Sequence, residues 1–488
     1  MSTSYPVEKI SGAGGVNASL GAARSKWRVF WADWVTERSL MWMQVGVILL
    51  VCLVSFGLGY KASMKQLTYV FFAIGGLMGF FVLLRWPGLG IIGILLSGMF
   101  IQYTGPGGFN LTMALVAMML VLWIVEMVTL RQEIKIVASY TMPPTIAMMV
   151  AVTISFGMGQ FPWFSFAGSA PLDAQLGGYA VYFLSFGAFL AIANQVREVR
   201  WLQWLTWVFI LFGAIYVIQL LVPAFRSINR MMYVNMGSLF WIWFVAMVYA
   251  QALFNRDLHL GWRGALLGMI VLSVYLLVRL KYKHKSGWIP VMVLLWVITT
   301  LRSLPLGLFL LVLGGLGVAV ILPDVLASED YSLATRLEVL PIMGQILQVN
   351  PFFGVGFANY YWYTPLFALR GFYVSFNSHN NYADLLVQAG ILGMIIFLWW
   401  IGQTSYLAWK LRKQVRGGFV EAYVNGAIGG LVGMIVVAFL GDWVLPFVYN
   451  IGLSGFRTSV VGWLFLGGLV VLQQIYATSS PVRDPQEN

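Results

Sequence analysis

The chain has 488 residues, of which 60% are hydrophobic and 9% are charged. Soluble globular proteins carry about 25% charged residues, so this composition excludes that class and indicates a protein embedded in a membrane. The net charge of +12 suits basic loops that meet anionic lipid headgroups. We expect no nucleic-acid partner, because the sequence has no soluble basic domain and no base-reading motif.

Apolar stretches and one polar interruption organise the chain. Residues 1–40 form an opening segment that we expect to be cytoplasmic and partly disordered. Apolar stretches fill 41–322, a polar segment covers 323–384, apolar stretches return over 385–476, and a short cytoplasmic tail, 477–488, ends the chain. The predicted fold is an all-α polytopic membrane protein with about twelve to fourteen transmembrane helices, each needing about 20 residues. The predicted stretches are 41–60, 67–84, 88–102, 111–130, 142–160, 178–194, 202–222, 238–254, 263–279, 288–301, 304–322, 385–407, 422–440 and 456–476.

The distribution of lysine and arginine predicts the orientation, because cytoplasmic loops of membrane proteins carry an excess of these residues. A cytoplasmic amino terminus places most of the 29 basic residues inside. The long loop 323–384 then lies on the outer face, together with the basic loop 279–287.

The long outer loop is expected to be folded, since loops of that length are usually either functional or disordered. Leu333, Leu337, Leu340, Ile342 and Ile346 recur at roughly helical spacing and predict a short helix on the membrane surface. A purely structural cap over the helix bundle is the alternative to a functional loop.

His379 stands at the end of this loop, directly before the chain re-enters the membrane. Titratable residues at such a boundary are costly to keep and are functional candidates. His379 opens a motif of His, Asn, nine residues, Gly, two residues and a further Gly, and an Asn-Pro-x-x-Gly-x-Gly turn precedes it at Asn350–Gly356. In this order the two motifs resemble those of the bacterial O-antigen ligase and O-antigen polymerase superfamily, over roughly residues 260–400.

The resemblance implies a fold similar to that of the C-type membrane glycosyltransferases, with a site on the periplasmic face of the bacterial inner membrane. It implies an inverting enzyme that moves a glycan from an undecaprenyl-diphosphate-linked donor to an acceptor hydroxyl without a cofactor. The ligase branch, whose acceptor is lipid A–core, is favoured because the histidine motif matches it fully. Nothing in the sequence reads the acceptor, so a repeat-unit polymerase and a protein O-oligosaccharyltransferase stay open.

A transporter for the same lipid-linked sugars is the alternative from another class of protein. Transporters often carry charged, broken helices near the middle of the membrane. Here the apolar stretches are almost free of charge, with Glu126 the main exception. This concentration of polarity in one outer loop favours surface chemistry over transport. The presence of both His379 and Arg336 argues against a third possibility, an inactive structural partner in an envelope complex.

Two residues fit the chemistry that the resemblance implies. A hydroxyl must lose a proton as it attacks the sugar, and the neutral imidazole of His379 suits that base; hydrogen-bonding of the loop or of a substrate is its alternative role. A diphosphate leaving group must be stabilised, and the guanidinium of Arg336 grips phosphate oxygens in a planar fork. The alternatives for Arg336 are an ion pair with Glu338 or Asp330, or a lipid headgroup contact.

Further basic residues are expected to contact the diphosphate. The family carries a second arginine at the outer end of an earlier span, where this chain has Lys283–Trp288 with a lysine in its place. Lys285 and Arg279 are both candidates for that role. Arg230 is a candidate for a third contact, or else anchors its loop at the headgroups.

The residues after His379 have both functional and structural explanations. Asn380 and Asp384 are four apart, so on a helix they share a face and could orient substrate or His379. They could equally cap the incoming helix and occupy its first turn. Gly390 and Gly393 are expected to permit close helix packing. No cluster of His, Asp, Glu and Cys has metal-ligand spacing, so no metal is expected.

Overall fold

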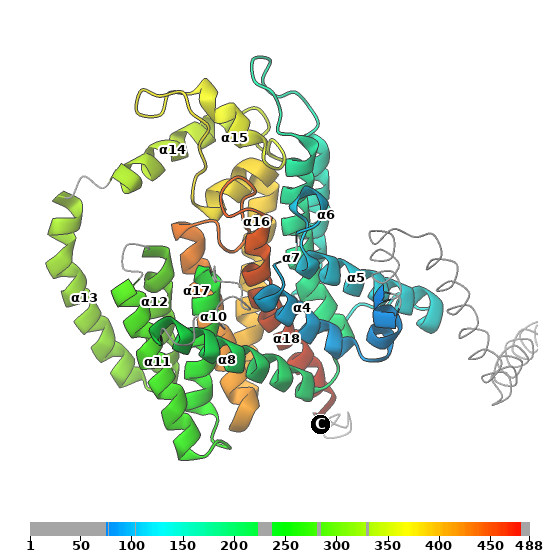
Figure 1. Cartoon of the computed structure of the whole chain (residues 1–488), viewed down its shortest axis with the longest axis vertical. Helices are drawn as coiled ribbons and strands as arrows, with labels where there is room; N and C mark the ends of the chain where they lie inside the picture. Colours follow the sequence, from blue (N-terminus) through cyan, green and yellow to red (C-terminus); the bar gives the residue numbers. More distant parts are fainter. Residues whose placement is uncertain are drawn as a thin grey trace, which may run out of the picture. The chain divides into compact units, whose positions relative to one another are not determined.

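A computed structural model describes most of the chain, which separates into two units, Met1–Gly79 and Phe80–Asn488. Nearly all of the described residues belong to the second unit, whose helices are shown in Figure 1. The predicted stretch 41–60 and most of 67–84 lie outside the described residues. The described ranges are 75–76, 78–102, 104–222, 237–280, 285–327 and 331–479.

The described residues form helices and no β-strand, with only two isolated bridges, Thr104–Asn110 and Leu369–Phe372. A helix covers each predicted apolar stretch from 88–102 onward, so the all-α fold class is confirmed. The elements are α4 (Pro87–Phe100), η1 (Pro106–Gly108), α5 (Leu111–Val125), η2 (Glu126–Arg131), α6 (Met142–Met158), α7 (Leu172–Gln195), α8 (Val199–Leu221), α10 (Ser238–Phe254), α11 (Leu260–Leu280), α12 (Lys285–Arg302), α13 (Leu304–Ala327), α14 (Tyr331–Leu347), α15 (Asn359–Tyr363), η4 (Thr364–Leu366), α16 (Asn381–Gln414), α17 (Gly418–Leu440), η5 (Leu453–Gly455) and α18 (Phe456–Ser479).

Seven helices of the described residues are long and apolar enough to cross a membrane. They include α7, α8, α16, α17 and the segment Leu453–Tyr476, which begins in η5 and continues into α18. Several further apolar helices, among them α4, α6 and α10, have 10–17 residues. The chain is therefore a multi-pass membrane protein.

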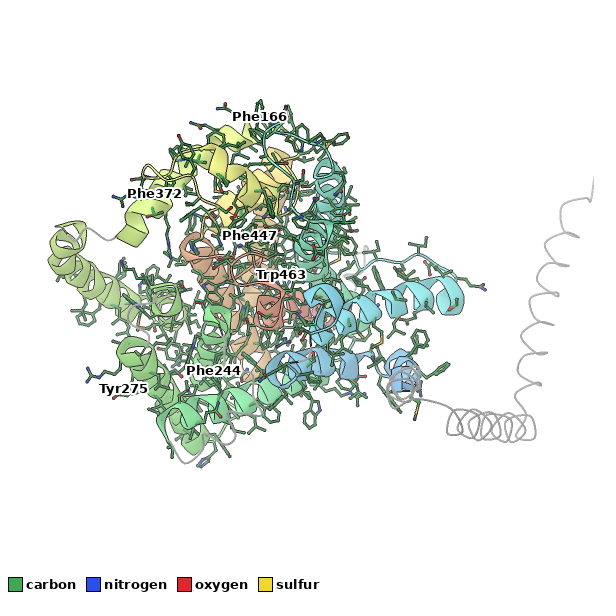
Figure 2. All side chains as sticks on the ribbon, turned by 45° about the horizontal axis from the view of Figure 1, so that its top comes forward. Phe166, Phe244, Tyr275, Phe372, Phe447 and Trp463 are labelled. Carbon is green, nitrogen blue, oxygen red and sulfur yellow. The ribbon has the colours of Figure 1, made fainter. Side chains whose placement is uncertain are left out.

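The interior of the bundle is built around α18. Every residue from 455 to 472 is buried, as expected for a helix that is apolar on all sides. Trp463 of α18, labelled in Figure 2, packs its ring 4.8 Å from that of Trp400 and 4.7 Å from that of Phe186. Helices at the side, such as α11, instead expose apolar residues, including Val271 and Tyr275, which suits contact with lipid.

A folded cap containing α14, α15 and η4 occupies the segment predicted as the outer loop (Figure 1). Its own core includes Ile342 and Ile346 of α14, packed with Tyr360 and Phe447. The helix predicted here is present, but its predicted apolar face is only partly right, because Leu337 and Leu340 are exposed. The exposed side chains of Leu337 and Leu340 give α14 an apolar surface that suits contact with a membrane.

Candidate functional site

His379 lies in a short turn that begins α16, and its backbone is held in an uncommon conformation. Its φ angle is +49°, in the left-handed region that residues other than glycine rarely adopt. The side chain of Asn377 accepts the His379 N–H, and the Ser378 hydroxyl accepts the Asn380 N–H at 3.0 Å. These bonds fix the backbone of the turn that carries the imidazole.

Asn380 and Asp384 support this turn from inside the fold. The Asn380 side chain caps α16 by accepting the N–H groups of Tyr382 and Ala383 at 2.9 and 3.3 Å. Asp384 is fully buried, and one carboxylate oxygen accepts hydrogen bonds from Ser378 at 2.6 Å and Tyr360 at 2.5 Å. Both residues therefore hold the histidine turn in place.

The Asn-Pro-x-x-Gly-x-Gly turn is hydrogen-bonded into a break in α16. The helix is interrupted at Gly390, where φ is 70° and ψ is −175°. The N–H groups of Val355 and Gly356 donate to the carbonyl oxygens of Val387 and Gln388, at 2.9 and 3.1 Å. The turn thus donates hydrogen bonds to carbonyl groups that have no partner within the first half of the helix.

The second half of α16 is satisfied by the start of the same turn. The Ile391 N–H donates to Pro351 at 2.8 Å, and the Leu392 N–H donates to Phe352 at 3.2 Å. The two motifs that carry the family resemblance are therefore one interlocked unit, and its first half-helix presents His379.

The expectation for the two glycines of this motif needs correction. Gly390 does allow a close approach, but of backbone rather than of a packed helix: a Cβ there would lie 2.2 Å from the Phe352 carbonyl oxygen. A Cβ at Gly393 would meet only Ala389 and Leu385 of α16 itself. The predicted span is a broken helix, because only glycine readily adopts the Gly390 conformation.

A second loop, residues 441–452 after α17, supplies partners for His379 that the sequence analysis did not single out. Asn450 Nδ2 lies 3.2 Å from His379 Nδ1 and donates to Asp442 Oδ1 at 2.7 Å. Asp442 is almost fully buried, and burial raises the pKa of its carboxyl, against the effect of the Asn450 hydrogen bond. The available sequence signal was a carboxylate directly after an apolar stretch, the same boundary position that marked His379.

Arg336 reaches the same region from the cap. It is half-buried on α14, and its Nη1 donates to the carbonyl oxygen of Leu440, at the end of α17, at 3.3 Å. Burial, and then the positive charge of Arg336, lower the pKa of His379 below its usual 6.5. His379 is therefore neutral near pH 7 and lies within the electrostatic reach of a fixed cation.

The alternative ion pair for Arg336 is not found with Glu338, which instead faces Arg370 at 3.8 Å. Asp330 lies outside the described residues. The Nε atom of Arg336 is buried and has no hydrogen-bond partner among the described residues. A buried guanidinium nitrogen in this state leaves a donor for a bound anion.

The other predicted basic residues differ in placement. Lys285 is exposed at the start of α12, next to Ser286, whose hydroxyl accepts the Trp443 indole N–H at 3.3 Å. Since Trp443 follows Asp442, Lys285 begins its helix at the edge of the histidine site. Arg279 is exposed in the last turn of α11, and Arg230 lies outside the described residues.

Among the described residues, no group of three or more His, Cys, Asp and Glu side chains could hold a metal ion.

Fold and site together define a multi-pass helical membrane protein in which a neutral histidine at the start of α16 lies within the electrostatic reach of an arginine from the folded cap. Residues 258–398, the segment that contains both side chains, match the family model described as O-antigen ligase. This match confirms the resemblance to the O-antigen ligase superfamily and supports a glycosyltransferase-type enzyme. Asp442 and Asn450 lie beyond the matched segment. No curated protein shows a significant match to the chain.

Proposed function

We propose that the protein is an inverting glycosyltransferase that moves a glycan from an undecaprenyl-diphosphate-linked donor to a hydroxyl of lipid A–core. The reaction takes place at the periplasmic face of the bacterial inner membrane, where the positive-inside rule puts the cap. One observation carries the proposal: the segment that matches the O-antigen ligase family holds both His379 and Arg336, and burial together with the Arg336 charge lowers the pKa of His379.

The chemistry divides between these two side chains. As the acceptor oxygen bonds to the anomeric carbon, its proton passes to His379, and the bond from that carbon to the diphosphate oxygen breaks. Undecaprenyl diphosphate leaves with the bonding electrons, and displacement from the opposite side inverts the anomeric centre. Arg336 stabilises the charge that grows on the diphosphate, in the way that arginine clamps serve phosphoryl groups elsewhere. No cofactor enters this scheme, and fixed cations take the place of a metal ion.

The partners of His379 decide which ring nitrogen can act as the base. Asn450 Nδ2 donates a hydrogen bond to Asp442 and also faces His379 Nδ1. In this arrangement Nδ1 must accept a hydrogen bond from the amide nitrogen. A neutral imidazole in that state carries its proton on Nε2 and has no free lone pair there. Turning the amide lets its oxygen accept from His379 Nδ1–H, which frees Nε2 as the base. Asp442 must then donate a proton to the same oxygen, and its raised pKa favours that protonated form.

We therefore expect Asp442→Asn to keep most of the activity, because its amide can donate to Asn450 where the protonated carboxyl would. Asp442→Ala should lower turnover roughly tenfold or more, since the amide of Asn450 loses its partner. Single-turnover rates of both variants, with melting temperatures as a check on folding, give the comparison. Equal losses in the two variants would contradict this tautomer scheme.

Lys285, Arg279 and Arg230 stay predictions as further diphosphate contacts. Lys285 precedes Ser286, whose hydroxyl accepts the indole N–H of Trp443. Direct substrate contacts by Asn380 and Asp384 also stay predictions. Both side chains already have structural partners, so their proposed contribution is to keep the His379 turn rigid.

The proposal is tested by incubating the purified protein in nanodiscs with a defined undecaprenyl-diphosphate oligosaccharide. Separate reactions contain lipid A–core, the donor alone, or a candidate protein acceptor. Glycosylated lipid A–core is the expected product, and its absence with His379→Ala links it to the site. Elongated donor or glycoprotein would move the assignment to polymerase or protein glycosylation, and no transfer to any acceptor would refute it.

A further inference from the structure

A cavity of about 280 Å³ lies beside the histidine site, between three segments that are far apart in sequence. The hairpin loop 104–110 forms one wall, the start of α7 forms another, and residues 448–454 form the third. The lining includes the polar side chains of Thr104, Asp173, Tyr449 and Ser454. None of its lining residues is used in the chemistry proposed above.

The walls of this cavity are fixed to one another. Asn110 is buried, and its side-chain Nδ2 donates to the Leu453 carbonyl at 2.8 Å while its side-chain Oδ1 accepts the Met113 N–H at 3.0 Å. Gly177 of α7 packs so closely on Leu453 that a Cβ there would lie 3.2 Å from its side chain. A cavity held in this way is preformed, as small-molecule sites usually are.

The lining fits an uncharged polyhydroxy ligand. Ala174, Val448 and Leu453 supply apolar surface, and hydroxyl groups and one carboxylate lie around it. The carboxylate of Asp173 disfavours an anion, and the lining contains no lysine or arginine to offset it. Sugar rings present both apolar C–H faces and hydroxyl groups that donate to carboxylates, so they match this mixture.

The rim continues into an aromatic surface. The Tyr449 ring stacks on Tyr361 with centroids 4.6 Å apart, and the Tyr449 hydroxyl accepts the Trp362 indole N–H at 2.9 Å. Flat aromatic side chains of this kind offer rigid contact area to a ligand at low entropic cost. Tyr449 also directly precedes Asn450, so the cavity and His379 share one loop.

All the lining residues lie outside residues 258–398, the part of the chain that matches the family model. The matched part holds His379 and Arg336, which act on the diphosphate and hydroxyl common to such reactions. Recognition of one particular glycan needs contacts that this common chemistry does not supply, and the cavity offers them next to the reacting groups.

We propose that this cavity binds a neutral saccharide unit of one of the two glycans, donor or acceptor. The proposal rests on the glycosyltransferase function given above. The probes are the lipid-free oligosaccharide released from the donor by mild acid, the deacylated lipid A–core oligosaccharide, and inorganic diphosphate. Each is titrated into the full-length protein in nanodiscs.

Ala174→Trp fills the cavity and Asp173→Asn removes its carboxylate. Both variants should weaken binding of one oligosaccharide by roughly tenfold, with inorganic diphosphate bound as before. Ala265→Trp makes the same change in a lipid-facing groove of α11 and should bind like the wild type. His379→Ala should lose transfer but keep the oligosaccharide affinity.

The oligosaccharide that loses affinity identifies the source of the bound sugar. Unchanged oligosaccharide affinity in both cavity variants would overturn the proposal, as would a wild type that binds neither oligosaccharide. Loss of affinity in the cavity variants without any transfer by the wild type would instead refute the proposed function and leave the saccharide site standing.

Discussion

Replacing His379 with alanine is expected to lower the single-turnover rate by about 10²–10⁴-fold and leave donor binding nearly unchanged. The acceptor hydroxyl loses its base, while Arg336 still contacts the diphosphate. Single-turnover kinetics and donor titration in nanodiscs separate the two effects. An alanine variant with full activity would remove His379 from the chemistry.

The backbone at His379 calls for a second variant. Its φ of +49° is more easily adopted by asparagine than by alanine. His379→Asn should therefore lose as much turnover as the alanine variant with a smaller effect on folding. His259→Ala is the matched control, because that histidine is exposed before α11 and should be dispensable. A loss confined to the alanine variant would indicate a backbone effect.

Gly390→Ala is expected to prevent the two family motifs from interlocking. The added Cβ would lie 2.2 Å from the Phe352 carbonyl oxygen, in a φ, ψ region that only glycine adopts readily. We expect a loss of at least about 3 kcal/mol in the free energy of unfolding, and loss of activity with it. Thermal unfolding in detergent and the transfer assay measure the two effects.

Gly402→Ala is the control in the same helix. It is helical and exposed, and nothing lies within 4 Å of its added Cβ. Alanine in a regular helix should stabilise by up to about 1 kcal/mol relative to glycine. A Gly390→Ala protein with the melting temperature and activity of the wild type would show that the break in α16 is not required.

Much of the fold follows from local sequence, because length and apolar character decide whether a segment crosses a membrane. The helices α7, α8, α17 and α18 lie where the apolar stretches predicted them. The break in α16 was not predicted, because 385–407 reads as one continuous apolar stretch. Its cause is the backbone of residues 350–356, which becomes a neighbour only in the folded chain.

In the site, too, some residues could be predicted from local sequence and others only from the folded chain. His379 could be named from its motif, boundary position and chemistry, and Arg336 from its chemistry and its place on the predicted surface helix. Asn450 could not, because it meets His379 only through the loop after α17, 71 positions away in sequence. Tyr360 and Ser378, which donate hydrogen bonds to Asp384, likewise meet it only when the cap folds back on α16.

The central claim is that His379 acts as a base within reach of the Arg336 charge, and the pH dependence of kcat/KM tests it most directly. A base must be deprotonated, so kcat/KM should fall as the pH drops below the His379 pKa, which lies below its usual 6.5. Arg336→Gln removes a positive charge that lowers this pKa. The acid limb of the profile should therefore move to higher pH.

Arg336→Lys keeps the charge and loses only the planar fork, so its acid limb should stay near that of the wild type while donor binding weakens. A limb that moves in the glutamine variant and not in the lysine variant is the predicted result. An acid limb at the same pH in the wild type and Arg336→Gln would contradict the account.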